Sequence, residues 1–319
     1  MLTSLCLSFS VTFLLLIVLL KTRLADFALD QPNERSLHMH LTPRTGGLAI
    51  VCGMLVAWMV ADVSLPWLFL ILALVGVSLI DDIRGLSVRW RLLVQLLICG
   101  FFVYLYSKQL HYLLWLPVLF VMVWMTNLYN FMDGSDGLAG GMGLFGFSSY
   151  AIAFYLSGDA LFANMSISIA AACFAFLLFN FYPAKIFMGD SGSIPLGFLA
   201  GAMALLGCVQ AYWPVWFPVL IFSPFIVDAT ITLIKRLRNG ERLSQAHKSH
   251  YYQRLVQIGW GHKKTAVAEY LLMLLCSLTA LLFLQASTLL VIILLVGWIL
   301  IYMVLAVLID KHWKQKISL

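Results

Sequence analysis

Acidic side chains beside glycines mark three short segments of this sequence as candidates for chemistry. Asp81 and Asp82 follow the apolar run LVGVSLI, Asp133 and Asp136 stand in DGSDG, and Asp190 stands in FMGDSGS. A glycine next to an acid lets the backbone turn tightly and come close to a ligand. One acidic pair at the end of an apolar run is usually a solvated helix end, but three acidic segments placed alike indicate a shared site.

Basic side chains accompany these acids, namely Arg84, Arg89, Arg91 and Lys185. Carboxylates ringed by fixed cations are poorly explained by packing. They are typical of a site for a hard divalent cation, because Mg²⁺ takes oxygen ligands and is usually bound by one or two carboxylates together with substrate phosphates. Fixed cations also bind the phosphate oxygens. The sequence therefore predicts phosphate chemistry that depends on Mg²⁺, with Mn²⁺ as its substitute.

A longer polar segment, about 235–264, carries histidines. His250 and Arg254 stand four residues apart, so one helical turn would direct both side chains toward the same anion. His247 precedes them, but without cysteines or a further histidine at ligand spacing the pair does not indicate a zinc site. Asp228, inside an apolar run, is predicted either to function in the site or to accept a buried hydrogen bond. Surface or loop positions are expected for the single histidines His38, His40, His111, His262 and His312.

The elements that must position these residues are membrane helices. Of the 319 residues, 62% are hydrophobic and 11% are charged, and the mean hydropathy is +0.97. A soluble globular domain is nearer a quarter charged, so this composition excludes one and indicates a polytopic membrane protein. The six cysteines are scattered singly through apolar runs and predict neither disulfides nor a zinc site. The expected surroundings are a lipid bilayer, and no nucleic acid partner is expected.

We expect an all-α bundle of eleven transmembrane helices in a single domain, residues 1–319, because a crossing needs about 20 mostly apolar residues. Loops on one side are short and nearly uncharged, whereas 19 of the 20 Lys and Arg residues fall on the other side. The positive-inside rule makes the basic side cytoplasmic, with the N-terminus outside and the C-terminus inside. The predicted spans are 3–20, 46–63, 66–80, 92–107, 113–129, 138–156, 161–179, 193–209, 214–234, 265–285 and 288–309, and the cytoplasmic loops lie near 21–45, 81–91, 130–137, 180–193 and 235–264.

The order and spacing of the motifs resemble one family of membrane enzymes. Asp81 with Asp82, NLYNFMDGSDG at 127–137, NFYPAKIFMGDSGS at 180–193 and a histidine-bearing loop ending in Arg-Leu resemble the polyprenyl-phosphate N-acetylhexosamine-1-phosphate transferases. That superfamily includes the bacterial transferases that start O-antigen and enterobacterial common antigen on a lipid carrier, and the phospho-muramoyl-pentapeptide translocase. Residues 30–47 are similar to its first cytoplasmic loop. Eleven spans with an external N-terminus fit the O-antigen-type branch better than the translocase, which has ten.

The resemblance implies a reaction and its location. A sugar 1-phosphate would pass from a UDP-N-acetylhexosamine to undecaprenyl phosphate, with release of UMP, at the cytoplasmic face of a bacterial inner membrane. Mg²⁺ would be held by Asp190, the main ligand, and Asp82. Direct attack by the lipid phosphate is favoured over a covalent aspartyl intermediate because it needs no unusual nucleophile. The sequence does not distinguish GlcNAc, GalNAc and FucNAc as the sugar, and it leaves a homodimer open.

Roles for individual residues follow from the same resemblance. Phe187 would stack on uracil, and Asp81 with Asp82 would lie by the attacking lipid phosphate. His250 and Arg254 would close the site over the diphosphate. The nucleotide pocket and the remaining substrate contacts would come from polar residues of the cytoplasmic loops, namely Arg44, Asn130, Asp133, Asp136, Asn180, Lys185 and His247.

The last loop departs from the family pattern. Tyr252 and Gln253 stand where paired histidines are usual, and His247 stands where an aspartate is common. The form HKSHYYQRL resembles the sub-branch that starts heteropolymeric O-antigens from acetamido sugars such as N-acetylglucosamine or N-acetylfucosamine. Transfer of phospho-muramoyl-pentapeptide is therefore the weaker alternative.

Two other classes remain as alternatives with less support. A transporter of lipid-linked sugars would show inverted repeats and ionisable residues near the bilayer midplane, but no repeat is seen and only Asp228 and Glu269 fall within spans. An intramembrane aromatic prenyltransferase would space its acids as D-x-x-x-D along helices, and the adjacent Asp81 and Asp82 do not fit that spacing.

Overall fold

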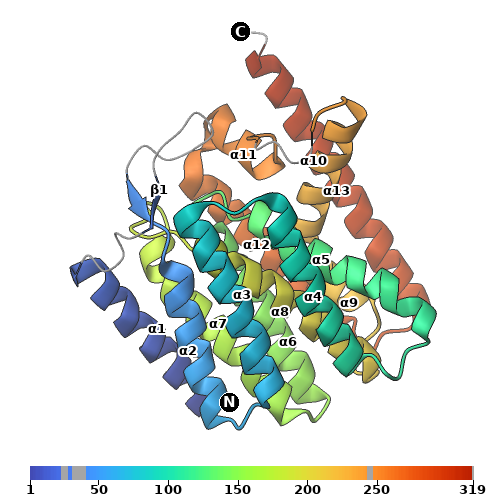
Figure 1. Cartoon of the computed structure of the whole chain (residues 1–319). Coiled ribbons are helices and arrows are strands. Elements are labelled where there is room, and N and C mark those ends of the chain that lie inside the picture. Colours follow the sequence, from blue (N-terminus) through green and yellow to red (C-terminus); the bar gives the residue numbers. More distant parts are fainter. Residues whose placement is uncertain (23–27, 31–40, 243–246, 318–319) are drawn as a thin grey trace.

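A computed structural model describes residues 1–22, 28–30, 41–242 and 247–317, and over these ranges the chain is an almost wholly helical bundle (Figure 1). Residues 31–40 of the predicted first cytoplasmic loop, with His38 and His40, lie outside the described residues. The helices are α1 Leu2–Thr22, α2 Gly46–Val60, α3 Leu65–Arg84, α4 Val88–Tyr106, η1 Tyr112–Leu114, α5 Trp115–Phe131, α6 Leu138–Leu156, α7 Ala160–Asn180, α8 Asp190–Val209, α9 Trp216–Ile221, α10 Ser223–Arg238, α11 Tyr251–Leu255, η2 Val256–Trp260, α12 Gly261–Leu282 and α13 Thr288–Ile317.

Within the described part of the chain, nine helices are long and apolar enough to cross a bilayer. The protein is therefore a polytopic helical membrane protein, because helices satisfy every backbone hydrogen bond internally where no water is present. Two of the predicted spans look different in the structure. The span predicted at 46–63 forms α2, which has only 15 residues. The span predicted at 214–234 divides at Phe222 into α9 and α10, and Pro224, near the start of α10, has no N–H to donate to the preceding turn.

The helices end and begin at other residues than predicted, so Asp81, Asp82 and Asp190 lie within helices and not in loops. Helix α3 continues to Arg84, so Asp81 and Asp82 lie in its last turns, and the predicted loop at 81–91 shortens to 85–87 because α4 begins at Val88. Asp190 is the first residue of α8. The acids are thus held by helix termini, which fix a side chain more firmly than a long loop would.

A short ladder ties the loop between α1 and α2 to the loop before α8. Strand β1, Leu29–Asp30, pairs antiparallel with β2, Thr42–Pro43, a pairing that the sequence did not predict. The carbonyl of Pro43 accepts a hydrogen bond from the Phe187 N–H at 2.7 Å, and the Gly46 N–H donates to the Phe187 carbonyl at 2.9 Å. The start of α2 and the start of α8 therefore lie side by side.

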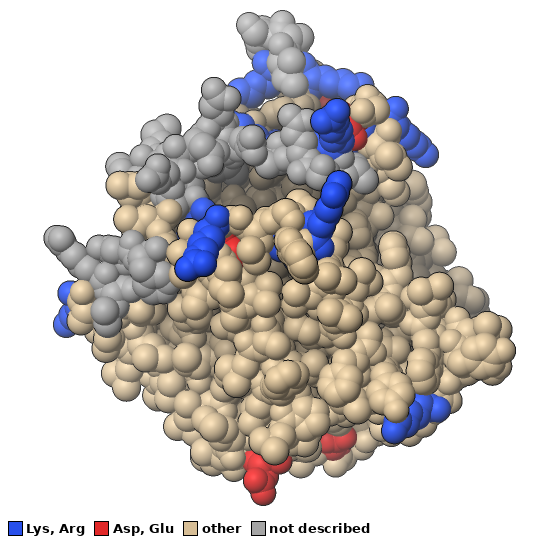
Figure 2. Space-filling model, viewed as in Figure 1, with Lys and Arg blue, Asp and Glu red and all other residues tan. Residues whose placement is uncertain are grey.

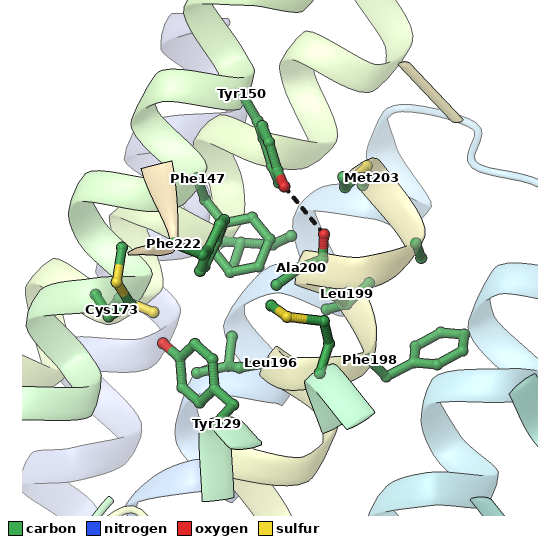
Figure 3. Close-up of a cluster of buried hydrophobic side chains, with 14 of the residues drawn as sticks. Tyr129, Phe147, Tyr150, Cys173, Leu196, Phe198, Leu199, Ala200, Met203 and Phe222 are labelled. Carbon is green, nitrogen blue, oxygen red and sulfur yellow. Dashed lines mark hydrogen bonds between the residues drawn. The ribbon is translucent and has the colours of Figure 1, made fainter. Parts of the chain in front are cut away.

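The core below the site packs aromatic side chains of neighbouring helices against α8 (Figure 3). Tyr129 of α5 and Phe147 and Tyr150 of α6 are completely buried. The Tyr150 hydroxyl donates to the carbonyl of Ala200 in α8 at 3.1 Å. A Cβ at Gly197 would lie 2.7 Å from a carbonyl oxygen of α5, so the missing side chain lets α5 and α8 approach closely. This packing fixes the helices whose ends carry the motif residues.

Charge is distributed unevenly over the bundle. In Figure 2 the Lys and Arg side chains gather at the end where α11 and the last turns of α13 lie, and the broad middle of the visible face is bare of charge. This is the asymmetry on which the predicted orientation depends. The uncharged middle is the surface expected against lipid tails.

Candidate active site

A cavity of about 180 Å³ opens among the helix ends and loops that carry the motifs. Seven of the thirteen predicted site residues line it, which brings together segments far apart in the sequence. The lining residues are Arg44, Asn130, Asp133, Gly134, Ser135, Asp136, Asn180, Phe187, Gly189, Asp190 and His262.

Asp190 links the cavity to a second acid through a shared arginine. Its Oδ1 accepts a hydrogen bond from Asn130 Nδ2 at 2.8 Å, and its Oδ2 lies 3.2 Å from Arg91 Nη1. The same Arg91 nitrogen lies 2.8 Å from Asp81 Oδ2. One guanidinium therefore bridges two carboxylates, as a planar fork of donors allows. Arg91 was predicted only as one of the basic residues around the acids, and the structure places it between Asp81 and Asp190.

Asp82 fixes the position of Asp190 from the neighbouring helix. Its two carboxylate oxygens accept hydrogen bonds from the backbone N–H groups of Asp190, at 3.1 Å, and Ser191, at 3.0 Å. These N–H groups at the start of α8 have no partner within the helix, and a negative charge there is favoured by the helix dipole. Asp82 thus caps α8 and holds the end of α8 beside the cavity.

Two further predicted residues cross-link the loops that form the cavity wall. Asn180 accepts a hydrogen bond from the Gly137 N–H at 2.9 Å and donates to the Ile186 carbonyl at 2.9 Å. Asp136 Oδ2 accepts from the Ala184 N–H at 3.0 Å. Both side chains are buried. The DGSDG loop and the loop before α8 are therefore held together by the motif residues themselves.

The oxygen donors of the cavity suit a hard cation of the Mg²⁺ kind. Among the described residues, no three Asp, Glu, His or Cys side chains form a ready-made metal site. Mg²⁺ is usually bound by one or two carboxylates and completes its shell with water and substrate phosphates, so a full protein cage is not needed. Asp190, the predicted main ligand, borders the cavity and so fits this role, as do the neighbouring carboxylates Asp133 and Asp136. Asp82, predicted as a second ligand, has both oxygens on backbone N–H groups.

Comparison with known proteins identifies the family of this chain. The family model of glycosyl transferase family 4 matches residues 64–208, from α3 to the last turn of α8. A probable undecaprenyl-phosphate N-acetylglucosaminyl 1-phosphate transferase of Bacillus subtilis (strain 168) is 31% identical over 283 residues, covering 82% of this chain and 78% of the relative. The chain belongs to the polyprenyl-phosphate hexosamine-1-phosphate transferases.

Other members of the transferase family match over similar lengths. A decaprenyl-phosphate N-acetylglucosaminephosphotransferase of Mycolicibacterium smegmatis is 30% identical over 298 residues, covering 76% of this chain and 72% of the relative. A phospho-N-acetylmuramoyl-pentapeptide-transferase of Chloroherpeton thalassium is 28% identical over 346 residues, covering 86% of this chain and 91% of the relative. The relatives therefore include both N-acetylglucosamine-phosphate transferases and a phospho-N-acetylmuramoyl-pentapeptide-transferase.

The histidine segment of this transferase does not line the cavity. His250 is buried, and its Nδ1 lies 3.2 Å from Asp228 Oδ1. Asp228 also accepts the N–H groups of Tyr251 at 2.8 Å and Tyr252 at 2.9 Å. Of the two roles predicted for Asp228, the structure shows the buried hydrogen bond. His250 is thus held by Asp228 through Nδ1 and is not among the residues that line the cavity, and its contact with a diphosphate stays a prediction.

His247, Arg254 and Lys185 are also outside the cavity lining. His247 Nδ1 lies 2.8 Å from the Ser249 hydroxyl. Partial burial, together with the charges of His250 and Arg236, lowers the pKa of His247 to about 4, so its ring is neutral at pH 7. Arg254 is paired with Asp310 at 2.6 Å, and the side chain of Lys185 is exposed. Position in a motif loop did not predict the direction of these side chains.

His262 is the cavity residue that sequence reasoning missed. Expected on the surface, it instead borders the cavity, with Nδ1 2.9 Å from the Ser135 hydroxyl and 3.7 Å from Asp136 Oδ1. Its ring is nearly parallel to that of Tyr182, with centroids 5.9 Å apart. The available signal was the sequence GWGH, because glycines at 259 and 261 indicate a break that can turn the following residue inward.

Gly189 provides a test of the junction between the first loop and α8. Its backbone, at φ +73° and ψ 171°, lies in a region open essentially to glycine alone, and a Cβ there would lie 2.3 Å from the Arg44 carbonyl oxygen. We expect Gly189→Ala to lower transferase turnover by about tenfold or more, because strain of about 1–3 kcal/mol displaces Asp190. Steady-state rates in purified protein measure this. Gly85→Ala is the matched control, since Gly85 has φ +67° but nothing within 4 Å of its Cβ position, and equal losses in both variants would contradict the contact argument.

Proposed function

We propose that this transferase moves an N-acetylhexosamine 1-phosphate from a UDP-sugar to undecaprenyl phosphate, releases UMP and thereby starts an O-antigen or related envelope polysaccharide. The observation that carries the proposal is the pairing of Arg91 with both Asp81 and Asp190 beside a cavity that Phe187 also lines. Such a site offers charge for a diphosphate and an aromatic ring for a base.

The reaction joins two anions, so charge neutralisation is the main task of the site. An oxygen of the lipid phosphate forms a bond to the phosphorus that carries the sugar, and the bond from this phosphorus to the bridging oxygen breaks as UMP leaves with that oxygen. Arg44 and Arg91 lie where they can oppose the repulsion between the reactants. Mg²⁺ held by Asp190 would add positive charge at the diphosphate when bound.

Proton transfer is not demanded of the acids. A phosphate monoester is largely ionised near neutral pH because its second pKa is about 6. Asp81 is paired with Arg91, and Asp82 accepts two backbone hydrogen bonds. Both carboxylates are thus suited to positioning, which supports direct attack by the lipid phosphate.

A shallow apolar depression supports approach of the lipid from the bilayer. It lies among α3, α4 and α8, and Asp81 and Arg91 stand at its polar end. We infer that the phosphate of undecaprenyl phosphate reaches Arg91 from this side while the nucleotide occupies the cavity. The other lining residues are the apolar Leu74, Val77, Val94 and Ile194 and the polar Ser78 and Gln95.

The proposed topology has eleven crossings, with the cavity on the cytoplasmic face of a bacterial inner membrane. Nine described helices are long enough to cross, and α2 and the bent pair α9 and α10 would supply the other two. At 1.5 Å per residue α2 is only about 22 Å long, so the residues that follow it would complete the crossing. The gathering of Lys and Arg at one end supports this orientation (Figure 2).

The decisive experiment measures UMP release by the purified full-length protein with Mg²⁺ and undecaprenyl phosphate. The donors are UDP-GlcNAc, UDP-GalNAc, UDP-FucNAc and UDP-MurNAc-pentapeptide. We expect turnover with an acetamido sugar and none after chelation of Mg²⁺. Release of UMP from none of the first three donors would contradict the proposal. Turnover with the muramoyl-pentapeptide donor alone would favour the second candidate, which the Chloroherpeton thalassium relative supports.

His262→Ala tests the nucleotide end of the cavity. We expect the KM for the UDP-sugar to rise about tenfold, as for loss of one hydrogen bond of about 1.4 kcal/mol, with the KM for undecaprenyl phosphate unchanged. Initial rates at varied concentrations of each substrate measure both constants. His312→Ala, which removes an exposed imidazole from α13, is the control. An unchanged KM for the UDP-sugar in His262→Ala would show that the ring does not contact the nucleotide.

A further inference from the structure

The last helix makes a polar contact with the histidine segment that the predicted chemistry does not use. Asp310 of α13 lies with Oδ1 2.6 Å from Arg254 Nη1, and its Oδ2 forms an ion pair with Lys235 Nζ. The Tyr251 hydroxyl is 3.4 Å from the same Oδ2 and also binds Lys235. We call these four residues, Lys235, Tyr251, Arg254 and Asp310, the Asp310 cluster.

Arg254 makes several contacts within and beside this cluster. Besides Asp310, its Nε donates to the Ser249 carbonyl at 2.9 Å. Its guanidinium lies 5.1 Å from the Tyr251 ring centroid and 5.9 Å from that of Trp313. The side chain is 13% exposed. A guanidinium that is paired with a carboxylate and lies close to two aromatic rings is held in one position, so Arg254 can act as a rigid strut.

The segment held by Arg254 also contacts the cavity wall. The Tyr252 hydroxyl donates to the Phe131 carbonyl at 3.3 Å. A Cβ at Gly134 would lie 2.2 Å from the Tyr252 oxygen, so α11 packs closely on the loop that carries Asp133 and Gly134. Contacts therefore run from Asp310 through Arg254 to α11, and from α11 to the cavity loop.

Helix α13 contacts the rest of the bundle along one face, where Trp298 donates to the Thr279 hydroxyl at 3.1 Å and the Tyr302 hydroxyl lies 2.6 Å from that of Ser223. It lies at the edge in Figure 1, and most of its apolar side chains are exposed. An acid directly after so long an apolar run is unfavourable unless it is paired. A second contact on the next turns of the helix strengthens the link, since the Lys316 ammonium donates to the Gln257 carbonyl. The cytoplasmic end of α13 is thus specifically fitted to the segment 249–257.

We propose that Asp310 is a positioning residue of this transferase. It holds α11 against the cavity loop through Arg254 and Lys235, so the last helix belongs to the framework of the active site. Arg254 acts here as a strut, which replaces the role at the diphosphate expected from its motif. The inference rests on the proposed function only in that UMP release is one of its two readouts.

A double-mutant cycle tests whether Asp310 and Arg254 act as one unit. The variants are Asp310→Asn, Arg254→Gln and the pair, in full-length protein, assayed with the UDP-sugar that the wild type uses. We expect each single variant to lower kcat/KM by about tenfold and the pair to lower it by about the same tenfold, because coupled residues are not additive. Losses that multiply to about 100-fold, or a large loss in Arg254→Gln with none in Asp310→Asn, would overturn the proposal.

Two matched variants separate positioning from general damage to α13. Asp310→Glu keeps the carboxylate and is expected to restore most of the activity. Lys314→Gln removes an exposed charge one turn further along the helix and is expected to behave as wild type. Loss of activity in Lys314→Gln equal to that in Asp310→Asn would overturn the assignment to Asp310.

Amide hydrogen exchange gives a readout that does not depend on turnover. In Asp310→Asn we expect faster exchange over 249–257 and unchanged exchange over 223–231 of α10. Unchanged exchange over 249–257 would overturn the inference, whatever the enzyme transfers. If the wild-type protein released no UMP but Asp310→Asn still exchanged faster than the wild type over 249–257, the proposed function would fail. The positioning role of Asp310 would stand.

Discussion

Replacing Asp190 by asparagine is expected to reduce UMP release by about 10³-fold, the size of loss found when a charged or polar group that stabilises a transition state is removed. Asparagine has nearly the same shape and can still accept the hydrogen bond from Asn130, so the helix end should fold normally. What it lacks is the charge that pairs with Arg91 and suits a divalent cation. Turnover is compared at varied Mg²⁺ concentration in protein purified from the membrane fraction.

The control for Asp190→Asn is the same exchange at another helix start. Asp159 caps α7, where its Oδ1 accepts the Phe162 N–H at 3.1 Å, and it does not line the cavity. Asparagine caps a helix about as well as aspartate, so Asp159→Asn should retain full activity. Near-normal turnover in Asp190→Asn would remove Asp190 from the proposed metal site. If neither variant were recovered from the membrane fraction, the loss of activity would come from misfolding and not from the missing charge.

The acidic half of the site could be predicted because it depends on local patterns. Asp81, Asp82 and Asp190 each end or begin an apolar run, and runs that cross a bilayer bring their ends to two common levels. Loops on one level must then lie near one another, so clustering follows from span assignment alone. Asn130 joins the same cluster since α5 ends there, and the structure places all four within a network of direct contacts or shared partners.

The histidine half could not be predicted because its contacts are between residues far apart in the chain. Nothing near Arg254 in the sequence indicates Asp310, which lies in another helix, or the packing of Tyr252 on Gly134. An i and i+4 spacing predicts that two side chains share a face but not what that face meets. His262 likewise reaches the cavity only through the irregular backbone before α12, where Gly259 has φ +113°.

Asp228→Ala is expected to lower activity to about 1% of the wild-type value or less, because the α11 segment is no longer held in place. Each buried donor left without a partner costs about 1–3 kcal/mol. Four donors converge on this carboxylate: Thr232 Oγ1 at 3.1 Å, His250 Nδ1 at 3.2 Å and the N–H groups of Tyr251 and Tyr252. Without it the Tyr251 and Tyr252 N–H groups lose their acceptor, although the capping contact between the His250 N–H and Gln253 Oε1, at 3.2 Å, remains at the start of α11. The segment that meets the cavity loop is then expected to loosen. Turnover and thermal unfolding are measured together.

Two companion variants decide whether the loss at Asp228 comes from α11. Thr232→Val removes one donor and leaves the carboxylate free to hold His250 and the two backbone N–H groups, so turnover should fall no more than about threefold, as for one hydrogen bond of less than 1 kcal/mol. Asp228→Asn should resemble the alanine variant, because the Tyr251 and Tyr252 N–H groups bind different carboxylate oxygens and the amide NH₂ would oppose one of them. Full activity in Asp228→Asn would mean that α11 is held in place without this carboxylate. The Asp310 cluster would then be sufficient to hold the segment.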